Sequence, residues 1–143
     1  MEELMKIYLT GELLSQIHQH GENAYPEEGA GLMLGIEKDG ERYVKKLLTL
    51  NNAREESARH NRYLLTAEDM LFGEQKAEAS GLNIIGIFHS HPDHPDLPSD
   101  FDLEYAVPWY SYLITRVKNG RAVSSKCWRL NDDRSGFEPE EII

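Results

Sequence analysis

The sequence predicts a single α/β domain in which helices flank a mixed, mostly antiparallel sheet. Strand-like and helix-like segments alternate along the 143 residues, which is typical of α/β domains. Two pairs of strand-like segments are joined by short turn sequences at residues 37–40 and 118–120, and these pairs predict antiparallel hairpins. Because no repeat, low-complexity tract or linker divides the chain, we expect residues 1–143 to form one domain.

The first part of the chain contains a strand, a helix and the first hairpin. Residues 5–9 alternate in polarity and predict an edge strand, and Thr10 is placed to cap a helix over residues 11–23. Residues 29–36 are apolar and rich in glycine, and they form a predicted hairpin with residues 42–50. The glycines indicate that another backbone comes close. This strand is therefore a candidate for strand addition by an extended peptide.

The middle of the chain predicts a loop, a brief strand and a second helix. Residues 51–61 lack apolar periodicity and predict a long exposed loop. Residues 63–65 are apolar and predict a short strand. Thr66 then begins a sequence like a capping box, and the helix that it opens is expected to end before Gly81. An Ile-rich strand follows and continues to His91.

The last part of the chain predicts a short helix, a second hairpin and a polar end. Ser99 is placed to cap a helix that ends near Ala106. The strand-like runs 109–117 and 121–130 flank an Asn-Gly dipeptide, which is a strong hairpin signal. Residues 131–143 are mostly polar and end in two isoleucines, so we expect them to be frayed or to dock on a partner.

Composition excludes several classes of partner and compartment. The formal net charge of −10 argues against binding to nucleic acid or an anionic membrane, because Lys45-Lys46 is the only basic pair available to neutralise phosphates. The single cysteine, Cys127, excludes an intrachain disulfide framework. The start of the chain does not resemble a secretory signal, and no apolar run has the length of a transmembrane helix. We therefore expect a cytoplasmic protein.

Three of the six histidines lie within residues 89–94, directly after the predicted Ile-rich strand. On a strand, His89 and His91 point to the same side, with their Cα atoms roughly 7 Å apart. If Ser99 is the N-cap, Asp102 is the third helical residue, and its carboxylate can be aimed back at the strand end. Two histidines and one aspartate leave the fourth position of a tetrahedral zinc ion open for water, which is typical of a catalytic site.

A zinc site of this kind also needs a general base. The base accepts a proton from the attacking water and passes it to the leaving amine. Glu27 and Glu28, which directly precede the Gly-rich strand, are the two candidates, and both remain open at this point. His18 and His20 lie on the polar face of the first helix, and we expect them to be solvated because no further ligands are nearby.

The chain matches one known signature in three places, which are Pro26-x-Glu28-x-x-Gly31-Leu32, His89-Ser90-His91-Pro92 and Ser99-x-x-Asp102. Together these residues resemble the signature of the JAMM (MPN-plus) metalloproteases. The order of the predicted elements is also similar to that of a whole small JAMM domain over about residues 5–130, and this similarity implies a cytidine-deaminase-like core.

The resemblance implies a role for each matching residue. His89, His91 and Asp102 would bind one zinc ion per chain, Glu28 would be the acid/base, and Glu27 would be a bystander. Ser99 would stabilise the tetrahedral intermediate. The implied reaction is hydrolysis of a peptide or isopeptide bond next to the C-terminal Gly-Gly of a ubiquitin-like or sulfur-carrier protein.

Two departures from the family pattern refine this expectation. Ala30 stands where many relatives have a cysteine, but that position is not a ligand, so activity is not affected. The chain also lacks the long insertions with which eukaryotic isopeptidases hold a ubiquitin chain, and it therefore resembles a minimal prokaryotic member.

Other readings of the same residues are weaker. The order His89-x-His91-x-Asp93-His94 is also found in metallo-β-lactamase-like hydrolases, but that fold needs further histidines downstream, and none follows His94. A zinc deaminase needs a Pro-Cys-x-x-Cys sequence, which the single cysteine rules out. We therefore expect Asp93 and His94 to be loop residues at the mouth of the site. The alternative from another class is a non-catalytic MPN-type scaffold that binds a partner protein.

Overall fold

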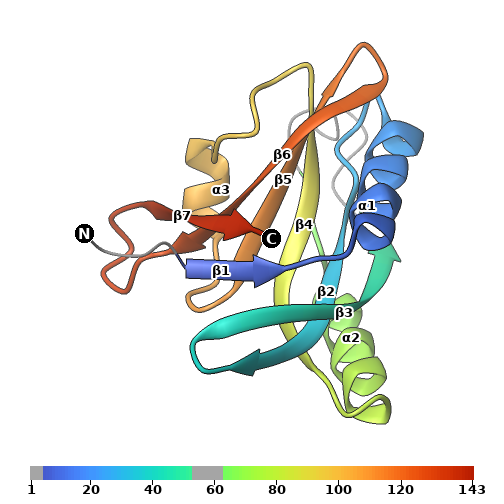
Figure 1. The fold of residues 1–143 in the computed structure, drawn as a ribbon. Helices are drawn as coiled ribbons and strands as arrows, with labels where there is room; N and C mark the ends of the chain where they lie inside the picture. The colour runs from blue at the N-terminus through green and yellow to red at the C-terminus, as the bar shows by residue number, and fades with distance from the viewer. Residues whose placement is uncertain (1–4, 53–62) are drawn as a thin grey trace.

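The strands form one curled, mixed sheet in this computed structural model, which describes residues 5–52 and 63–143 (Figure 1). Within these residues the strands are β1 Met5–Tyr8, β2 Ala30–Lys38, β3 Glu41–Leu50, β4 Asn83–Pro92, β5 Ser111–Lys118, β6 Arg121–Leu130 and β7 Phe137–Ile142. Their order in the sheet is β1-β3-β2-β4-β5-β6-β7. The pairs β2-β3, β2-β4, β5-β6 and β6-β7 are antiparallel, whereas β4-β5 and both short pairings of β1, with β3 and with β7, are parallel. The predicted fold class is confirmed.

Helices cover both faces of the sheet. The described part of the chain contains α1 Gly11–Ala24, α2 Ala67–Ala79 and α3 Asp100–Tyr105. Ile17 of α1 packs into a core with Met33 and Phe88 of the sheet. Ala77 of α2 and Leu103 of α3 pack on the opposite side, in a second cluster of buried side chains. None of the helices in the described ranges has the length and apolar sequence needed to span a membrane.

The predicted helix starts are confirmed by their caps. Thr10 accepts a hydrogen bond from the backbone N–H of Leu13 at 3.2 Å. Thr66 and Asp69 form a complete capping box at the start of α2. Gly81 follows α2 with a φ of +69°, a conformation that glycine adopts without strain.

The glycines of β2 lie where the expected close approach occurs. A Cβ atom on Gly31 would lie 2.3 Å from the carbonyl oxygen of Leu48, and one on Gly35 would lie 1.9 Å from that of Tyr43. Both carbonyls belong to β3. However, β2 pairs with β3 along one edge and with β4 along the other. The expectation of strand addition at β2 is therefore wrong, because both of its edges are already hydrogen-bonded.

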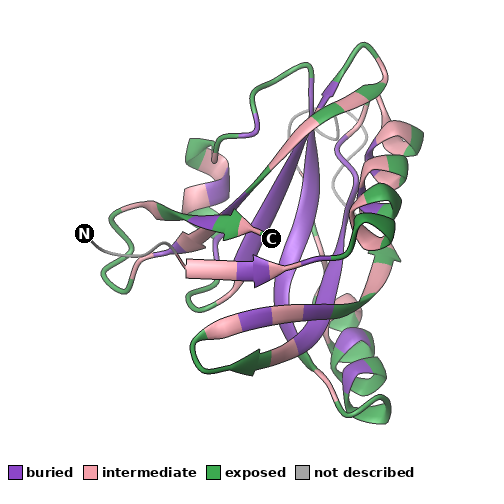
Figure 2. Ribbon diagram, in the orientation of Figure 1, coloured by how far each residue is buried: buried purple, intermediate pink, exposed green. Residues whose placement is uncertain are grey.

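A β-bulge in β4 sets the direction of the histidines. Met33 of β2 pairs with Gly86, whereas the next residue, Leu34, pairs with Ile84, so Ile85 is an extra residue in β4. Unbroken alternation from Ile84 would place His89 on the opposite face. With the bulge, His89 follows Ile87 on the face that α2 and α3 cover. β4 is buried from its second residue to its last, as its continuous purple ribbon shows (Figure 2).

Three local expectations are wrong. Residues 63–65 form no strand; they run as irregular backbone into α2. The end of the chain is not frayed, because Phe137–Ile142 forms β7, which pairs with both β6 and β1. The second hairpin begins at Ser111, because Trp109 has a φ of 80° and lies in a turn. Of the expected loop at 51–61, residues 53–61 lie outside the described ranges.

The two histidines of α1 are half-buried, which contradicts the expectation that they are solvated. A ring nitrogen of His18 lies 2.8 Å from the hydroxyl of Ser125 on β6, and a ring nitrogen of His20 lies 3.1 Å from the carbonyl oxygen of Ala30. Both side chains therefore join α1 to the sheet. Sequence spacing did not indicate this, because the partners lie far along the chain.

Candidate metal centre

The end of β4 brings two imidazoles together. His89 and His91 are 1% and 5% exposed, and their ring centroids lie 5.0 Å apart. The predicted placement on one side of the strand is therefore confirmed. Thr115 and Arg116 of β5 and Ala30 of β2 pair with this part of β4, so the backbone that carries the rings is held from both sides.

The first turn of α3 aims a carboxylate at these rings. Ser99 and Asp102 form a capping box, in which the Asp102 N–H donates to Ser99 Oγ at 3.0 Å and the Ser99 N–H donates to Asp102 Oδ2 at 2.9 Å. The same carboxylate lies 3.1 Å from His91 Nε2 and 3.7 Å from His89 Nε2. Asp102 is thus both a cap and a possible metal ligand, as the spacing Ser99-x-x-Asp102 predicts.

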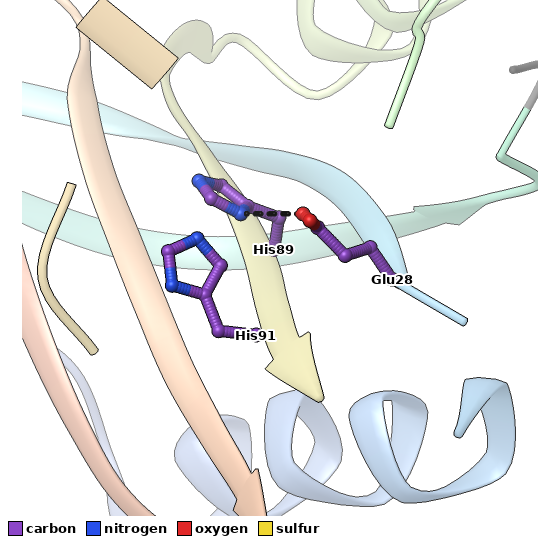
Figure 3. A group of neighbouring side chains, drawn as sticks. All are labelled: Glu28, His89 and His91. Atoms are coloured by element: carbon purple, nitrogen blue, oxygen red, sulfur yellow. Dashed lines mark ion pairs between the residues drawn. The ribbon is translucent and has the colours of Figure 1, made fainter. Parts of the chain in front are cut away.

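Glu28 reaches the same rings from the segment before β2. Its side chain is 3% exposed, and Oε1 lies 3.4 Å from His89 Nδ1 (Figure 3). Possible ligand atoms of Glu28, His89 and His91 lie within 4.8 Å of one another; Asp102 is not part of this group, although its carboxylate contacts both histidines. Glu27, by contrast, is only half-buried and is absent from this group. Of the two glutamates that the sequence left open, Glu28 is the one beside the histidines.

The orientation of His91 indicates what kind of ligand the centre binds. His91 Nδ1 lies 2.7 Å from the carbonyl oxygen of Pro95, which can only accept, so Nδ1 carries a proton and donates it. In the neutral ring, Nε2 is then an acceptor, and it faces the carboxylate of Asp102 at 3.1 Å. Two acceptors at this distance repel each other unless a proton or a cation lies between them. A backbone carbonyl that fixes the tautomer in this way is typical of histidine metal ligands.

Unpartnered polar atoms give the same indication. Within the described residues, Glu28 Oε1 and both ring nitrogens of His89 are buried without a hydrogen-bond partner. Leaving such atoms unpaired costs about 1–3 kcal/mol each. A divalent cation removes this cost, because imidazole nitrogens and carboxylate oxygens are the donors that zinc prefers among the residue types present here. The donor set therefore fits a zinc ion.

The pKa values at the centre follow from the same contacts. Burial by itself lowers the pKa of His91, but the carboxylates of Asp102 and Glu28 raise it, and the net result is above the ordinary value. Burial by itself raises the pKa of Asp102, but His89 and His91 hold it well below its usual range. In the absence of metal, a proton on His91 takes the place of the cation.

A cavity opens beside these residues. It has a volume of about 380 Å³ and is lined by Glu28, His91, His94, Pro95, Leu97, Ser99, Asp100 and Phe101. The hydroxyl of Ser99 accepts the Asp102 N–H and donates no hydrogen bond among the described residues, so its proton can be donated to a ligand in this cavity. All five predicted site residues therefore meet at one place, at the end of β4 and the start of α3.

Asp93 and His94 have the loop positions that the sequence predicts. Asp93 accepts hydrogen bonds from Tyr25 Oη at 2.6 Å and from the Asn119 N–H at 2.9 Å, which ties its loop to the turn between β5 and β6. His94 lines the cavity and is not part of the group of possible ligand atoms. Neither residue lies where the metallo-β-lactamase-like pattern requires a ligand.

Two residues that contact the centre, Tyr63 and Asn52, are not predicted from the sequence. The ring of Tyr63 stacks on His89 with a centroid separation of 4.5 Å, although residues 63–65 had been assigned to a strand. Asn52 donates from Nδ2 to the carbonyl oxygen of Glu28 at 3.0 Å. No pattern in the sequence distinguishes Asn52 from Asn51, because the contact depends on how the end of β3 lies beside Glu28.

Comparison with protein families finds one match that spans most of the chain. Residues 10–131 match the family described as prokaryotic homologs of the JAB domain. The matched range includes every residue of the centre described above.

Individual relatives agree with this match. The chain is 30% identical over 116 residues to the "Probable TtuB-protein conjugate cleaving protease" of Thermus thermophilus, an alignment that covers 81% of this chain and 74% of the relative. It is 38% identical over 77 residues to the "Desampylase" of Pyrococcus furiosus, with 53% of this chain and 52% of the relative covered. A solution structure of a protein from Salinibacter ruber matches with a TM-score of 0.75 and 42% identity, and covers 97% of this chain and 90% of that one.

Proposed function

The chain belongs to the prokaryotic homologs of the JAB domain, and we propose that it is a zinc-dependent peptidase or isopeptidase. The bond that it hydrolyses is an amide next to the C-terminal Gly-Gly of a ubiquitin-like or sulfur-carrier protein. This choice of substrate is supported by the two relatives, which are described as a conjugate-cleaving protease and a desampylase. A cytoplasmic location and a single domain over residues 1–143 are part of the same proposal.

One observation carries the metal assignment. The Nε2 atom of His91 and the carboxylate of Asp102 face each other at 3.1 Å, and Nδ1 of His91 is already used by the carbonyl of Pro95. In this proposal His89, His91 and Asp102 hold one zinc ion per chain. When bound, zinc polarises the scissile carbonyl and lowers the pKa of water, so that hydrolysis proceeds at neutral pH.

Glu28 is the acid/base of the proposed reaction. Its carboxylate is buried beside His89, and one oxygen has no hydrogen-bond partner among the described residues, so it can accept a proton from the attacking water. It then donates that proton to the leaving nitrogen. The C–N bond therefore breaks with release of a neutral amine. Glu27 takes no part in this proposal, because it is only half-buried and, of the two glutamates, Glu28 is the one that contacts His89.

Ser99 is the residue that stabilises the tetrahedral intermediate. Its hydroxyl lines the same cavity as Glu28 and His91 and accepts the Asp102 N–H, an arrangement that leaves the hydroxyl proton for a developing oxyanion. A preorganised donor of this kind contributes a factor of about 10²–10³ in kcat.

The competing proposal is a non-catalytic MPN-type scaffold. A scaffold has no need for a carboxylate that is 3% exposed and has one unpaired oxygen, a feature that costs stability. The geometry of Glu28 therefore favours an enzyme. Metal content after purification separates the two proposals, because a scaffold without zinc chemistry does not retain a stoichiometric ion.

The test uses ubiquitin-like proteins encoded in the same genome, each fused through its C-terminal Gly-Gly to a reporter protein. We expect at least one fusion to be cleaved after the second glycine, with the new carboxyl end identified by mass spectrometry. Cleavage should stop with a zinc chelator and return with added zinc. If the zinc-loaded protein cleaves none of these fusions and no isopeptide-linked conjugate of them, the proposed substrate class is wrong.

The variant that tests the mechanism is Glu28→Gln, because glutamine keeps the shape of the side chain but accepts no proton. We expect turnover to fall by a factor of about 10²–10⁴ while zinc stays bound. Glu27→Gln is the matched control and should retain activity. An inactive Glu27→Gln together with an active Glu28→Gln would reverse the assignment.

A further inference from the structure

Asn52 joins two parts of the candidate centre that are distant in sequence. It follows the end of β3, and its side-chain Nδ2 donates to the carbonyl oxygen of Glu28 at 3.0 Å. Its Oδ1 accepts the backbone N–H of Leu64, also at 3.0 Å. One amide group therefore links the residue that carries the acid/base carboxylate to the segment that leads into α2.

The segment at the other end of this link lies on the centre as well. Tyr63, the neighbour of Leu64, stacks on the ring of His89 at a centroid separation of 4.5 Å. Glu28 approaches the same imidazole through Oε1, which lies 3.4 Å from Nδ1. Asn52 thus contacts the backbone of Glu28 and that of Leu64, which is next to Tyr63. The side chains of Glu28 and Tyr63 both contact His89.

The peptide group between Glu28 and Gly29 is held from two sides. Its N–H donates to Ser90 Oγ of β4 at 2.8 Å, and its carbonyl accepts from Asn52 Nδ2 at 3.0 Å. The next carbonyl, that of Gly29, accepts the Ser90 N–H at 2.9 Å. Asn52 therefore supplies the bond that fixes this peptide group on the side away from β4. Because the carboxylate lies at the end of a side chain attached there, a rotation of this peptide moves it relative to His89.

We propose that Asn52 is a positioning residue that sets the place of the Glu28 carboxylate, with Leu64 as its second anchor. The inference rests on the proposed function, in which Glu28 accepts and donates the proton. The amide of Asn52 does both tasks at once, whereas aspartate lacks the donor and alanine lacks both groups. A displacement of a reacting group by about 1 Å can reduce the rate about 10²-fold.

The experiment compares Asn52→Ala and Asn52→Asp with Asn51→Ala, an exposed neighbour of the same type. The probe is the Gly-Gly fusion that the wild-type protein cleaves fastest. We expect Asn52→Ala to lower kcat 10- to 100-fold, with KM changed less than twofold. Zinc affinity, measured by chelator competition, should change less than twofold, because the two described hydrogen bonds of Asn52 go to the backbone of Glu28 and Leu64, neither of which is a proposed zinc ligand.

A double-mutant cycle separates positioning from a general loss of structure. If Asn52 acts through Glu28, then Asn52→Ala should have almost no further effect in a Glu28→Gln background. Effects that multiply in the double variant would overturn the proposal, and so would an Asn52→Ala variant with wild-type kcat. If Asn52→Ala is unfolded by circular dichroism, Asn52→Asp decides instead, because it keeps the acceptor for the Leu64 N–H.

A readout that needs no substrate keeps this proposal distinct from the proposed function. The visible absorption of the Co²⁺-loaded protein is titrated with pH, and its midpoint responds to a carboxylate that accepts a proton beside the metal. We expect Asn52→Ala to move the midpoint in the same direction as Glu28→Gln, with Asn51→Ala unchanged. If no fusion is cleaved, this titration still tests whether Asn52 positions Glu28. An Asn52→Ala curve equal to that of the wild type would overturn the inference.

Discussion

Two clusters of charged residues contact β4, one near each end of the strand. They differ in how hydrogen-bond donors and acceptors are paired within each cluster. Near the start of the strand, the fully buried Arg42 donates to the carbonyl of Ile85 at 3.1 Å and to Ser111 Oγ at 2.7 Å. The ring of Trp109 covers the guanidinium at 4.3 Å. Near the end of the strand, the members are the rings of His89 and His91 and the carboxylates of Glu28 and Asp102, and Nε2 of His91 faces Asp102 as an acceptor because Nδ1 carries the proton.

The first cluster is complementary in charge. Beside Arg42, Arg129 donates to Glu140 at 2.8 Å, and the carboxylate of Glu37 lies 3.6 Å from Arg42 Nε. Two guanidinium groups face two carboxylates, so the charges balance, although Arg42 Nε and Nη2 and Arg129 Nε have no hydrogen-bond partner among the described residues. In the second cluster the acceptor Nε2 of His91 faces the carboxylate of Asp102, and this repulsion is removed only by a proton or a metal ion. Charge complementarity, more than burial, therefore separates a structural cluster from a candidate site.

The strongest test of this difference removes one acceptor from the metal centre. The wild-type protein should purify with about one zinc ion per chain, and His89→Ala should lose it on dialysis, because only three protein ligands are proposed. Activity should fall to background. Metal content is measured by mass spectrometry of the folded protein. Full zinc occupancy in His89→Ala would show that the ligand assignment is wrong.

The matching change in the complementary cluster should affect stability and leave zinc unchanged. Glu140→Gln removes the negative charge that faces Arg129, and breaking a buried ion pair costs about 3–5 kcal/mol. We expect the lower end of this range in the free energy of unfolding, since the amide still accepts one hydrogen bond. Zinc per folded chain should not change.

Urea unfolding measures this effect, with Glu138→Gln on the exposed side of β7 as the matched control. The control should lie within about 0.5 kcal/mol of the wild type. If Glu140→Gln loses zinc while its folding free energy is unchanged, the division between the two clusters fails.

Zinc removal should make stability depend on pH. In the zinc-free protein the folded-state pKa of His91 is raised by Asp102 and Glu28 against the effect of burial. A raised pKa gives a stabilisation that is fully present below the ordinary value of 6.5 and is lost as pH rises through the folded-state value. The lowered pKa of Asp102 acts only at much lower pH, where its contribution is lost as pH falls.

The melting temperatures of the zinc-loaded and zinc-free proteins should therefore diverge as the pH rises above about 6.5, because zinc replaces the lost proton. Calorimetry in buffer with a chelator and in buffer with zinc measures the gap. A gap that narrows with rising pH would contradict the proposed exchange of proton for metal.

The smallest effect is expected for Asp93→Ala combined with His94→Ala. Both residues lie in the loop beside the cavity, and Asp93 serves as a hydrogen-bond acceptor for Tyr25 and Asn119. We expect zinc content and most activity to remain, with a loss of about 1 kcal/mol of stability for each hydrogen bond. Loss of zinc from this double variant would restore the metallo-β-lactamase-like reading.

Local chemistry made much of the centre predictable. A helix cap has a short sequence signature, and Ser99-x-x-Asp102 identified both the start of α3 and the direction of the Asp102 carboxylate. Strand alternation likewise placed His89 and His91 together. These predictions depend on neighbours within a few residues, where spacing determines geometry.

Features that depend on distant neighbours were not predictable. The extra residue at Ile85 follows from how β2 pairs with β4, and β7 exists because β1 and β6 offer partners to a polar segment. The pairing of β2 with β4 also occupies the edge of β2 that β3 leaves open, which excludes the predicted strand addition. Tyr63 was assigned to a strand because its sequence is apolar and β-like, but its ring packs on His89 instead.

The anchored loop between His91 and Asp102 limits where this chain can change length. Asp96 accepts a hydrogen bond from Ser124 Oγ at 2.7 Å, and Trp128 Nε1 donates to the Asp96 carbonyl at 3.0 Å, so β6 fixes the middle of the loop. The Pro95 carbonyl holds His91 from the same loop. An insertion between Asp96 and Ser99 would move the helix that carries Asp102 but not the strand that carries the histidines. Insertions and deletions in natural variants should therefore fall outside residues 91–102.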